Sequence, residues 1–576
     1  MPQGRRKVPF SGKAKKMQIQ EKRQRKGVPA FLTGQKGNSG GRDQDSRVLK
    51  INAQPSQSSR NKSARYALQF FQESEDEIRQ RKEEAFLPLT PALNDLEIAA
   101  DNYFSADVEF PKRPPWNHEM SPQLLELQEQ RYFTEYVSNL EKECKNISYF
   151  ELNLETWRQL WRVLEMSDVI LFIVDIRYSA LMFPPSLYHY VTDTLKKDLI
   201  LVLNKVDLAP PPLVVAWKNY FIEKFPSLHV IMFTSFPGYN LRSNPQKKSG
   251  LKVCRLKGRM RMAAEGAQKV LDVCKQIVEN EVDLTSWQEK IIEEMKEEYE
   301  IEKVNVAEYI NAKSSAEDRY TEHEKFQDGV LTIGCVGHPN VGKSSLLNAL
   351  MGKKVVSVSR TPGHTKHFQT IFLTPNVKLC DCPGLVFPSK TPKNLQVLMG
   401  SFPIAQLREP YSSIRYLAEH MDLIKLLALQ HPEDDEEWSA IEVCNAWAQK
   451  RGFFTARTAR LDSYRAANHL LRMTLEGKIC LCLQPPEYSQ KKEFWEKHPD
   501  ISMVKWIQAL ERFEDNNEPD ENFPSEEEAD SEAGQESGSE SPGSVDEDNG
   551  SDSGNDSSIK PGPSNLNKFA ALDSTE

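Results

Sequence analysis

Apolar runs of strand length recur along the middle of the chain, separated by segments with helical spacing. They are Asp168–Val174, Leu199–Leu203, His229–Phe233, Leu331–Val336, Thr370–Leu373 and Val377–Cys380. Strands that are buried on both faces and alternate with helices form parallel sheets covered by helices. The pattern therefore predicts an α/β domain with a mostly parallel sheet.

The remaining segments divide the chain into further regions. Apolar residues three and four apart predict helices at 121–145 and 153–167, and residues 392–512 read as helical apart from a candidate short strand at Lys478–Leu483. We expect five regions: a basic disordered arm at 1–65, a mixed and partly helical region at 66–150, the α/β domain at 151–390 with a charged insertion at about 241–328, a helical domain at 391–512 and an acidic disordered tail at 513–576.

The two ends of the chain carry opposite charge. Residues 1–50 hold 14 Lys and Arg against 3 Asp and Glu, whereas residues 511–576 hold 3 against 20. Both ends are poor in the large apolar residues that a core requires. The basic arm predicts nucleic-acid binding or a nuclear or nucleolar address, with a merely solvated charge run as the alternative. Serines in the acidic tail predict a phosphorylation zone.

Composition also excludes several classes of protein. No run approaches the ~20 apolar residues that span a bilayer, and Met1–Phe10 lacks the apolar core of a signal peptide. The 9 cysteines are scattered, without the spacing of a disulfide framework. We expect a soluble intracellular protein with reduced thiols.

A glycine-rich loop follows the run at 331–336 and precedes a helical segment at Ser345–Leu350. Its sequence, Gly337-His-Pro-Asn-Val-Gly-Lys-Ser344, matches a phosphate-binding loop, in which backbone N–H groups surround phosphate. Lys343 would contact the β- and γ-phosphates, and the Ser344 hydroxyl would bind Mg²⁺. The predicted contacts are Gly337, Asn340, Val341, Gly342, Lys343, Ser344 and Ser345.

Two further segments complete this predicted phosphate site. Asp381-Cys-Pro-Gly384 ends the run at 377–380, where a GTPase places a carboxylate on the metal side and a glycine that senses the γ-phosphate. Between the two loops, Thr365 is the candidate for a second Mg²⁺ ligand, with Thr361 as the alternative. Lys343, Thr365 and Gly384 are therefore the expected catalytic set.

The segment Asn204-Lys-Val-Asp207 follows the run at 199–203 and predicts guanine recognition. The Asp207 carboxylate can accept hydrogen bonds from two guanine donors that adenine does not offer. We expect Asn204 to tie this loop to the phosphate loop and the stem of Lys205 to cover the base. Thr234 and Ser235 end the next run, where a backbone N–H would meet the guanine O6 atom.

In ordinary GTPases the phosphate loop comes before the loop that binds the base. Here the base loop at 204 precedes the phosphate loop at 337, so the order of the segments is permuted. A parallel sheet accepts such a permutation when the former termini are joined, which the segment 235–331 can do. The helical region from about 390 then directly follows Gly384. We therefore hypothesise that GTP and GDP set different poses of that region.

This motif set resembles the circularly permuted GTPases that include nucleostemin and the bacterial and yeast ribosome-assembly GTPases. The resemblance covers about 150–390 and extends to Arg451-Gly452 and Tyr464–Asn468. It implies maturation of the large ribosomal subunit, binding of rRNA, and a nuclear or nucleolar location with cytoplasmic shuttling as an option. The chain departs from the family in that Asp175-Ile-Arg177 is followed by proline only at Pro184, and in its long charged insertion.

Leu385 stands where many signalling GTPases place a glutamine that orients water, so intrinsic hydrolysis should be slow. The resemblance implies K⁺ as a second cofactor, held in part by Asn340, with a loop-stabilising role for Asn340 as the alternative. A signalling-type GTPase and a weakly hydrolysing GTP-binding scaffold remain competing interpretations. An ATPase is opposed by Asp207.

Overall fold

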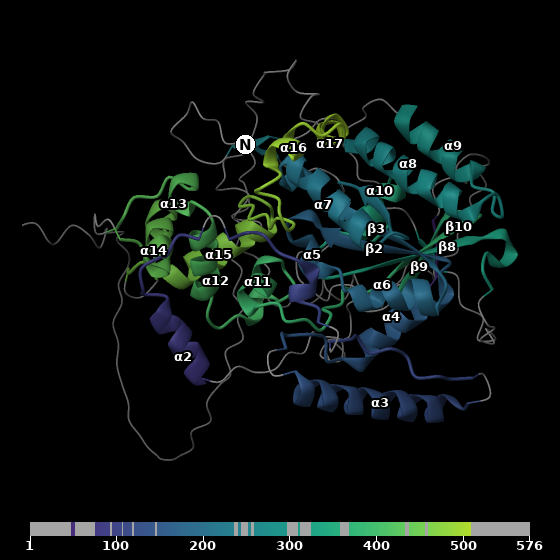
Figure 1. Cartoon of the computed structure of the whole chain (residues 1–576), viewed down its shortest axis with the longest axis horizontal. Coiled ribbons are helices and arrows are strands. Elements are labelled where there is room, and N and C mark those ends of the chain that lie inside the picture. The colour runs from purple at the N-terminus through teal and green to yellow at the C-terminus, as the bar shows by residue number, and fades with distance from the viewer. Residues whose placement is uncertain are drawn as a thin grey trace, which may run out of the picture. The chain divides into compact units, whose positions relative to one another are not determined.

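The six apolar runs form the central strands of one mixed sheet (Figure 1). The strand order is β4-β3-β2-β8-β10-β9-β1-β7, in which neighbours from β4 to β10 are parallel and β9 is antiparallel to β10. The strand bounds are β1 Val48–Ile51, β2 Val169–Asp175, β3 Asp198–Asn204, β4 His229–Met232, β7 Tyr309–Asn311, β8 Leu331–Gly337, β9 Gln369–Thr374 and β10 Val377–Asp381. The expected α/β class with a mostly parallel sheet is confirmed.

The computed structural model describes residues 48–51, 75–92, 95–105, 108–117, 120–144, 147–234, 240–242, 252–254, 259–296, 309–311, 324–356, 368–432, 437–455 and 459–508. Most of the basic arm and all of the acidic tail lie outside these residues. Strand β1 lies within the arm expected to be disordered, where its antiparallel pairing with β9 gives Val48–Ile51 a regular structure. A second, two-stranded sheet pairs β5 (Asn240–Arg242) with β6 (Lys252–Cys254).

Helices cover both faces of the central sheet (Figure 1). On one face, α4 packs on β8; on the other, α10 packs on β8 and β10, while α7 packs on β4. The helices of this layer and of the N-terminal region are α2 Glu75–Glu84, α3 Pro122–Glu143, α4 Leu154–Met166, α5 Ser179–Met182, α6 Pro185–His189, α7 Pro211–Lys224, α8 Arg259–Val278, α9 Thr285–Lys296 and α10 Lys343–Leu350. Short turns of helix are η2 Ala100–Asn102, η3 Ile176–Tyr178, η4 Tyr190–Thr194, η5 Val206–Leu208 and η6 Gln327–Gly329.

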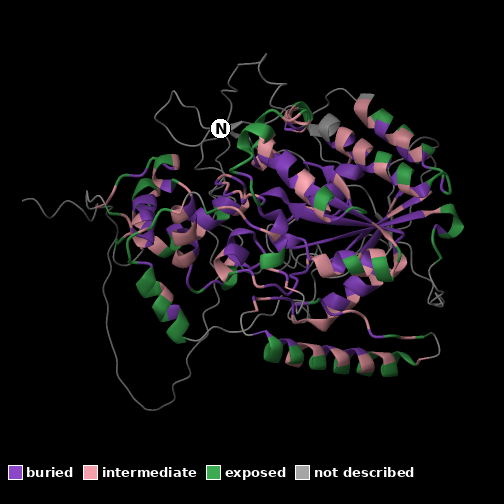
Figure 2. Ribbon diagram, in the orientation of Figure 1, coloured by how far each residue is buried: buried purple, intermediate pink, exposed green. Residues whose placement is uncertain are grey.

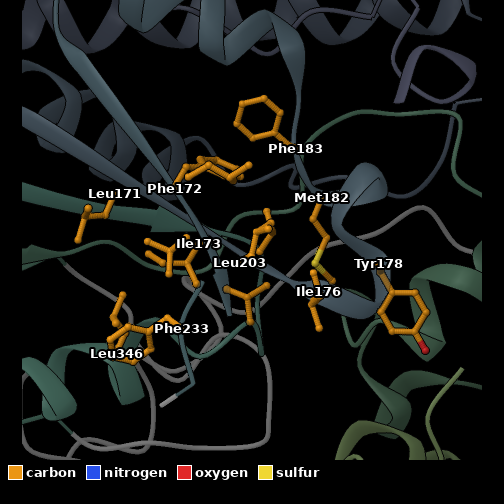
Figure 3. Close-up of a cluster of buried hydrophobic side chains, with 14 of the residues drawn as sticks. Leu171, Phe172, Ile173, Ile176, Tyr178, Met182, Phe183, Leu203, Phe233 and Leu346 are labelled. Carbon is orange, nitrogen blue, oxygen red and sulfur yellow. The ribbon is translucent and has the colours of Figure 1, made fainter. Parts of the chain in front are cut away.

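The core lies along β2, all of whose residues are buried. Figure 2 shows the sheet as the most buried part of the molecule, whereas the outer side of α3 is exposed. Figure 3 shows side chains from β2 meeting Leu203 of β3, Phe233 beyond β4 and Leu346 of α10. Each large aliphatic side chain buried here contributes about 1.5–3 kcal/mol. The rigid core fixes where the strands end, and the loops that carry the expected chemistry begin there.

The charged insertion contains part of this core. Its helices α8 and α9 pack together, α8 also contacts α10 and β4, and α9 contacts β9. Leu271 and Trp287 are fully buried in these contacts. The outer faces of both helices are charged, so the sequence pattern predicted only a charged segment and not its apolar faces. The insertion therefore supplies one of the layers that cover the sheet.

Helices make up most of the region after Gly384. They are α11 Lys393–Leu398, η7 Ile404–Gln406, α12 Tyr411–His420, α13 Leu423–Leu426, α14 Ala440–Arg451, α15 Ser463–Leu475, α16 Lys492–Glu496 and α17 Ile501–Ile507. The strand expected at Lys478–Leu483 is wrong, because this segment runs against η3 and α7, where the Leu483 amide donates to Arg177 and its carbonyl accepts from Trp217.

The first described residues of the N-terminal region contact this helical part. Amides at Leu89 and Ala92 donate to the carbonyls of Trp438 and Glu419, and Ile98 donates to Gln484. The Glu97 carboxylate accepts from the backbone amides of Glu487 and Ser489. Residues between 89 and 98 thus contact segments between 419 and 489, which the linear division into regions did not foresee.

Candidate nucleotide-binding site

The expected site residues gather at the carboxyl edge of the sheet. Register places Asp175 of β2 beside Asn204 of β3, and Ile173 beside Gly337 of β8. On the other side of β8, Asp381 of β10 is in register with Cys335. The loops that follow β3, β8 and β10 therefore emerge side by side, at the edge where open parallel sheets bind ligands.

The phosphate loop joins β8 to α10 through residues in unusual backbone conformations. Gly342 caps the helix with φ 101°, and Asn340 also has a positive φ of 59°. A side chain at Gly342 would be strained in that conformation. The turn brings the chain directly into the N-terminus of α10, where unpaired N–H groups and the helix dipole favour an anion.

Lys343 begins α10 and is almost fully buried. Its Nζ atom donates to the carbonyl oxygens of Gly337 and His338, at 2.9 and 2.6 Å. Burial lowers the pKa of Lys343 to about 8, although nearby Asp381 opposes this effect. The side chain is therefore a cation at neutral pH that lies inside the curve of the phosphate loop.

Ser344 and Asp381 form the metal side of the site. The Ser344 hydroxyl donates to the Asp381 carboxylate at 3.3 Å, and Asp381 is fully buried. An oxygen-only pair at this place fits Mg²⁺, which takes few protein ligands and completes its shell with phosphate and water. Thr365, Thr361 and Ser235 lie outside the described residues. Elsewhere among those residues, no group of three His, Cys, Asp or Glu side chains is suited to hold a metal.

Gly384 lies directly against the phosphate loop. A Cβ atom there would come within 2.8 Å of the Pro339 Cα and 3.2 Å of the Lys343 Nζ. The next amide, that of Leu385, donates to the Gly337 carbonyl at 3.3 Å, and the Leu385 side chain is fully buried. Leu385 thus packs in the core and offers no polar group to water.

The loop after β3 contacts the phosphate loop at two points. Asn204 donates from its side-chain amide to the Val341 carbonyl at 2.7 Å, the contact expected from the sequence. Lys205, in a left-handed conformation with φ 59°, donates to the Asn340 carbonyl at 2.6 Å. These bonds hold together the loops after β3 and β8, the two strands on either side of β2.

Asp207 and Thr234 lie together at the outer end of this loop. The Thr234 hydroxyl donates to an Asp207 carboxylate oxygen at 2.6 Å. Burial raises the pKa of Asp207, and the bond from Thr234 acts in the opposite direction. The hydroxyl orients the carboxylate and leaves its second oxygen as a further acceptor.

Sequence reasoning missed a buried ion cluster next to this loop. Asp175 accepts from the guanidinium of Arg177 at 3.0 and 2.8 Å and from Lys205 at 2.9 Å. Burial opposes ionisation of Asp175, but the two cations outweigh it and hold its pKa well below the usual range. The available signal was an acid that ends an apolar strand, with an arginine two residues later.

It also missed contacts from the phosphate loop to residues after α11. The Asn340 amide donates to the Gly400 carbonyl at 3.0 Å, and the His338 Nδ1 lies 3.1 Å from the Ser401 hydroxyl. Burial lowers the pKa of His338 to about 3, so this imidazole is neutral. Nothing in the sequence marks Gly400 as a partner, because it contributes only a backbone oxygen.

In the part of the chain that the structure describes, none of the helices combines the length and apolarity needed to cross a membrane. Solved structures of YlqF, one GDP-bound and one GNP-bound from T. maritima, align with 57% of this chain at 20% and 19% identity, with TM-scores of 0.32 and 0.33. They cover 100% and 98% of the respective YlqF chains.

Sequence comparisons are more specific. Residues 332–442 match the family model described as 50S ribosome-binding GTPase. Large subunit GTPase 1 of Saccharomyces cerevisiae is 34% identical over 67% of this chain and 59% of its own. Guanine nucleotide-binding protein-like 1 of Homo sapiens is 45% identical over 88% of this chain and 89% of its own, and that of Rattus norvegicus is 46% identical over 86% and 88%. The chain therefore belongs to the guanine nucleotide-binding protein-like 1 family of GTPases, and its G domain is circularly permuted.

Proposed function

We propose that this GTPase hydrolyses GTP slowly as a conformational switch in the biogenesis of the large ribosomal subunit. The observation that carries the switch is the contact of Gly384 with Pro339 and Lys343 of the phosphate loop. A γ-phosphate placed against Lys343 competes with Gly384 for this space, and the chain leaves Gly384 toward α11 and the helical region. Hydrolysis would thus change the path of that segment.

Guanine selectivity is assigned to Asp207, with Lys205 covering the base and the backbone at Thr234 and Ser235 near the guanine O6 atom. The supporting geometry is the Thr234 bond, which orients the Asp207 carboxylate, and the bond from Lys205 to Asn340, which places the lysine stem between the two loops. Gly337, Asn340, Val341, Gly342 and Ser345 complete the proposed phosphate contacts from the loop and the first turn of α10.

Mg²⁺ is assigned to Ser344 and Asp381, with Thr365 as the proposed third protein ligand. The ion would supply charge neutralisation for the phosphates, while Lys343 and the α10 N-terminus hold them in place. Slow intrinsic turnover follows from Leu385, which is buried and has no group to orient water. K⁺ is the proposed aid, with the Oδ1 atom of Asn340 as its ligand, since the Nδ2 atom bonds Gly400.

The partner assignment rests on the relatives. One is named large subunit GTPase and the matching family model is described as ribosome-binding. The basic residues 1–50 are suited to rRNA phosphates. We therefore assign the pre-ribosomal large subunit and its rRNA as partners and the nucleus or nucleolus, with cytoplasmic shuttling, as the location. The acidic tail would carry phosphorylation sites.

GTP turnover measured in K⁺ buffer, with and without purified large ribosomal subunits, tests this function. We expect the subunits to raise kcat by roughly 100-fold or more, because a partner must supply what Leu385 does not. Small ribosomal subunits at equal concentration are the control. Tight, guanine-selective binding without stimulation by large subunits would instead favour a signalling-type GTPase or a GTP-binding scaffold that acts on proteins.

A further inference from the structure

The last described residues of the chain reach back to the loop after β3. Gln508, which caps the C-terminus of α17 and is buried, donates from its side-chain amide to the carbonyls of Val206 and Ala209 at 2.7 and 2.8 Å. These two carbonyls belong to the first residue of η5 and to the residue that follows it, and η5 is the short turn that contains Asp207. A single amide group therefore holds both ends of the turn.

The end of α15 reaches the same loop through Arg177. The guanidinium donates to the carbonyl of Thr474 at 2.7 Å while it also pairs with Asp175. Asp175 in turn pairs with Lys205 at 2.9 Å. A chain of charged contacts thus runs from the C-terminal turn of α15 to the lysine that we assign to the face of the base.

Between these two contacts, the segment after α15 packs directly on the turn. A Cβ atom at Gly477 would lie 2.7 Å from a methyl group of Leu208, and the Cys482 thiol donates to the Leu208 carbonyl at 3.6 Å. Contacts from residues 474–508 therefore lie along the whole of η5. We use the name C-terminal clamp for the residues that make these contacts, namely Arg177, Thr474, Gly477, Cys482 and Gln508.

We propose that the C-terminal clamp is part of the guanine site and sets the affinity for GDP and GTP alike, with Gln508 and Arg177 as positioning residues. The loop needs such support, since Lys205 is left-handed and η5 is a single turn. A recognition loop that is already held in its binding conformation loses less freedom when the ligand binds. The inference rests on the proposed assignment of Asn204–Asp207 to guanine.

The clamp contacts the side of the site that holds the base, which GDP and GTP share. Its effect should therefore be equal for both nucleotides. Coupling between sites is reciprocal. A nucleotide that orders the loop after β3 therefore also stabilises the packing of residues 474–508 against that loop. The helical region then responds to nucleotide occupancy here and to the γ-phosphate through Gly384.

The test measures binding and dissociation of GDP and a non-hydrolysable GTP analogue with the full chain carrying Gln508→Leu or Arg177→Met. We expect each variant to raise both dissociation constants about tenfold, mainly through faster dissociation, with the GTP to GDP ratio changed less than twofold. Hydrogen exchange at residues 470–485 should slow with GDP in the parent and lose that response in both variants.

Lys218→Met is the matched control, because it removes an ion pair to Asp500 at 2.7 Å that also joins α7 to this segment but does not touch the loop. Its nucleotide affinity should equal that of the parent. If Gln508→Leu and Arg177→Met lower the melting temperature yet bind nucleotide like Lys218→Met, the clamp is only structural and the inference fails. Gln508→Leu alone decides the matter if Arg177→Met does not fold.

Asp207→Asn separates this inference from the proposed function. In a chain whose clamp is intact, this variant should bind XTP in preference to GTP, the reverse of the parent's preference. An unchanged preference would overturn the assignment of the guanine loop, whatever the clamp variants do. If the preference is reversed and the clamp variants bind nucleotide like the parent, the assignment of the guanine loop is supported and only the inference about the clamp fails.

Discussion

The guanine end and the phosphate end of the site both contact the helical region, but they do so with opposite chemistry. At the guanine end, the loop offers backbone carbonyls at Val206 and Ala209, and the side chain comes from Gln508. At the phosphate end, the loop offers the side chains of Asn340 and His338, and their partners are a carbonyl and a hydroxyl at Gly400 and Ser401.

The difference suggests that one end of the site serves to hold the nucleotide and the other to distinguish GTP from GDP. Bonds to backbone oxygens hold the loop that we assign to guanine, which is the group that GDP and GTP share. Gly384 lies against the backbone of Pro339, between His338 and Asn340. The bonds of these two side chains to residues 400–401 should therefore respond to a change that the γ-phosphate causes there. Variants that cut the bonds to residues 400–401 should therefore affect turnover, whereas variants of the C-terminal clamp should affect the affinity for both nucleotides.

The largest effect should come from Lys343→Met, which removes the cation that we assign to the phosphates of both nucleotides. We expect the affinities for GDP and GTP to fall together by roughly 100-fold or more, because each charge-assisted bond to phosphate is strong. Equilibrium binding of both nucleotides measures this. Lys354→Met, just beyond α10, is the control; near-parental affinity of Lys343→Met would show that the loop does not bind phosphate.

Much of this site could be predicted from the sequence, because its residues follow apolar strands. Strands β2, β3 and β8 are buried on both faces, so they are continuous apolar runs that the sequence predicts as strands. Parallel strands bring the residues at their carboxyl ends together. The contact of Asn204 with Val341 follows from that arrangement. Each of these inferences used residues that lie within a few positions of a strand end.

Other contacts had no local signal. Gln508 reaches a loop 299 residues away and the carbonyl of Thr474 accepts from Arg177 across 297 residues, so only the packed fold brings them together. Lys478–Leu483 alternates like a strand, yet its neighbours are η3 and α7, which offer no strand to pair with. Long-range packing decides such cases against local propensity.

A smaller effect should follow Asn340→Ala. The variant loses its bond to Gly400 and the proposed K⁺ ligand, so we expect turnover in KCl to fall about tenfold toward the rate in NaCl, while GDP affinity changes less than threefold. Ser401→Ala cuts only the neighbouring contact with His338 and should keep the response to K⁺. Equal turnover of Asn340→Ala and parent in KCl would contradict the assignment.

The smallest effect should be a pH dependence of stability from His338. Its pKa is lowered from 6.5 to about 3 in the folded protein, so the unfolded chain binds more protons between these values. Stability therefore falls as pH decreases through this window, by about 1 kcal/mol between pH 6.5 and pH 5.5 from this group. Urea unfolding should show that His338→Gln lacks this part of the decline; parallel profiles would count against a neutral His338.

The order of strands in the sheet also determines when the sheet can be completed during synthesis. Strands β2, β3 and β4 are neighbours and leave the ribosome well before β8, at residues 331–337, which covers the other edge of β2. Until then, an apolar strand presents unpaired backbone groups, which invite pairing with other chains. In an unpermuted domain the strand before the phosphate loop comes first, whereas here the half-built sheet must wait for its central strand with an open edge.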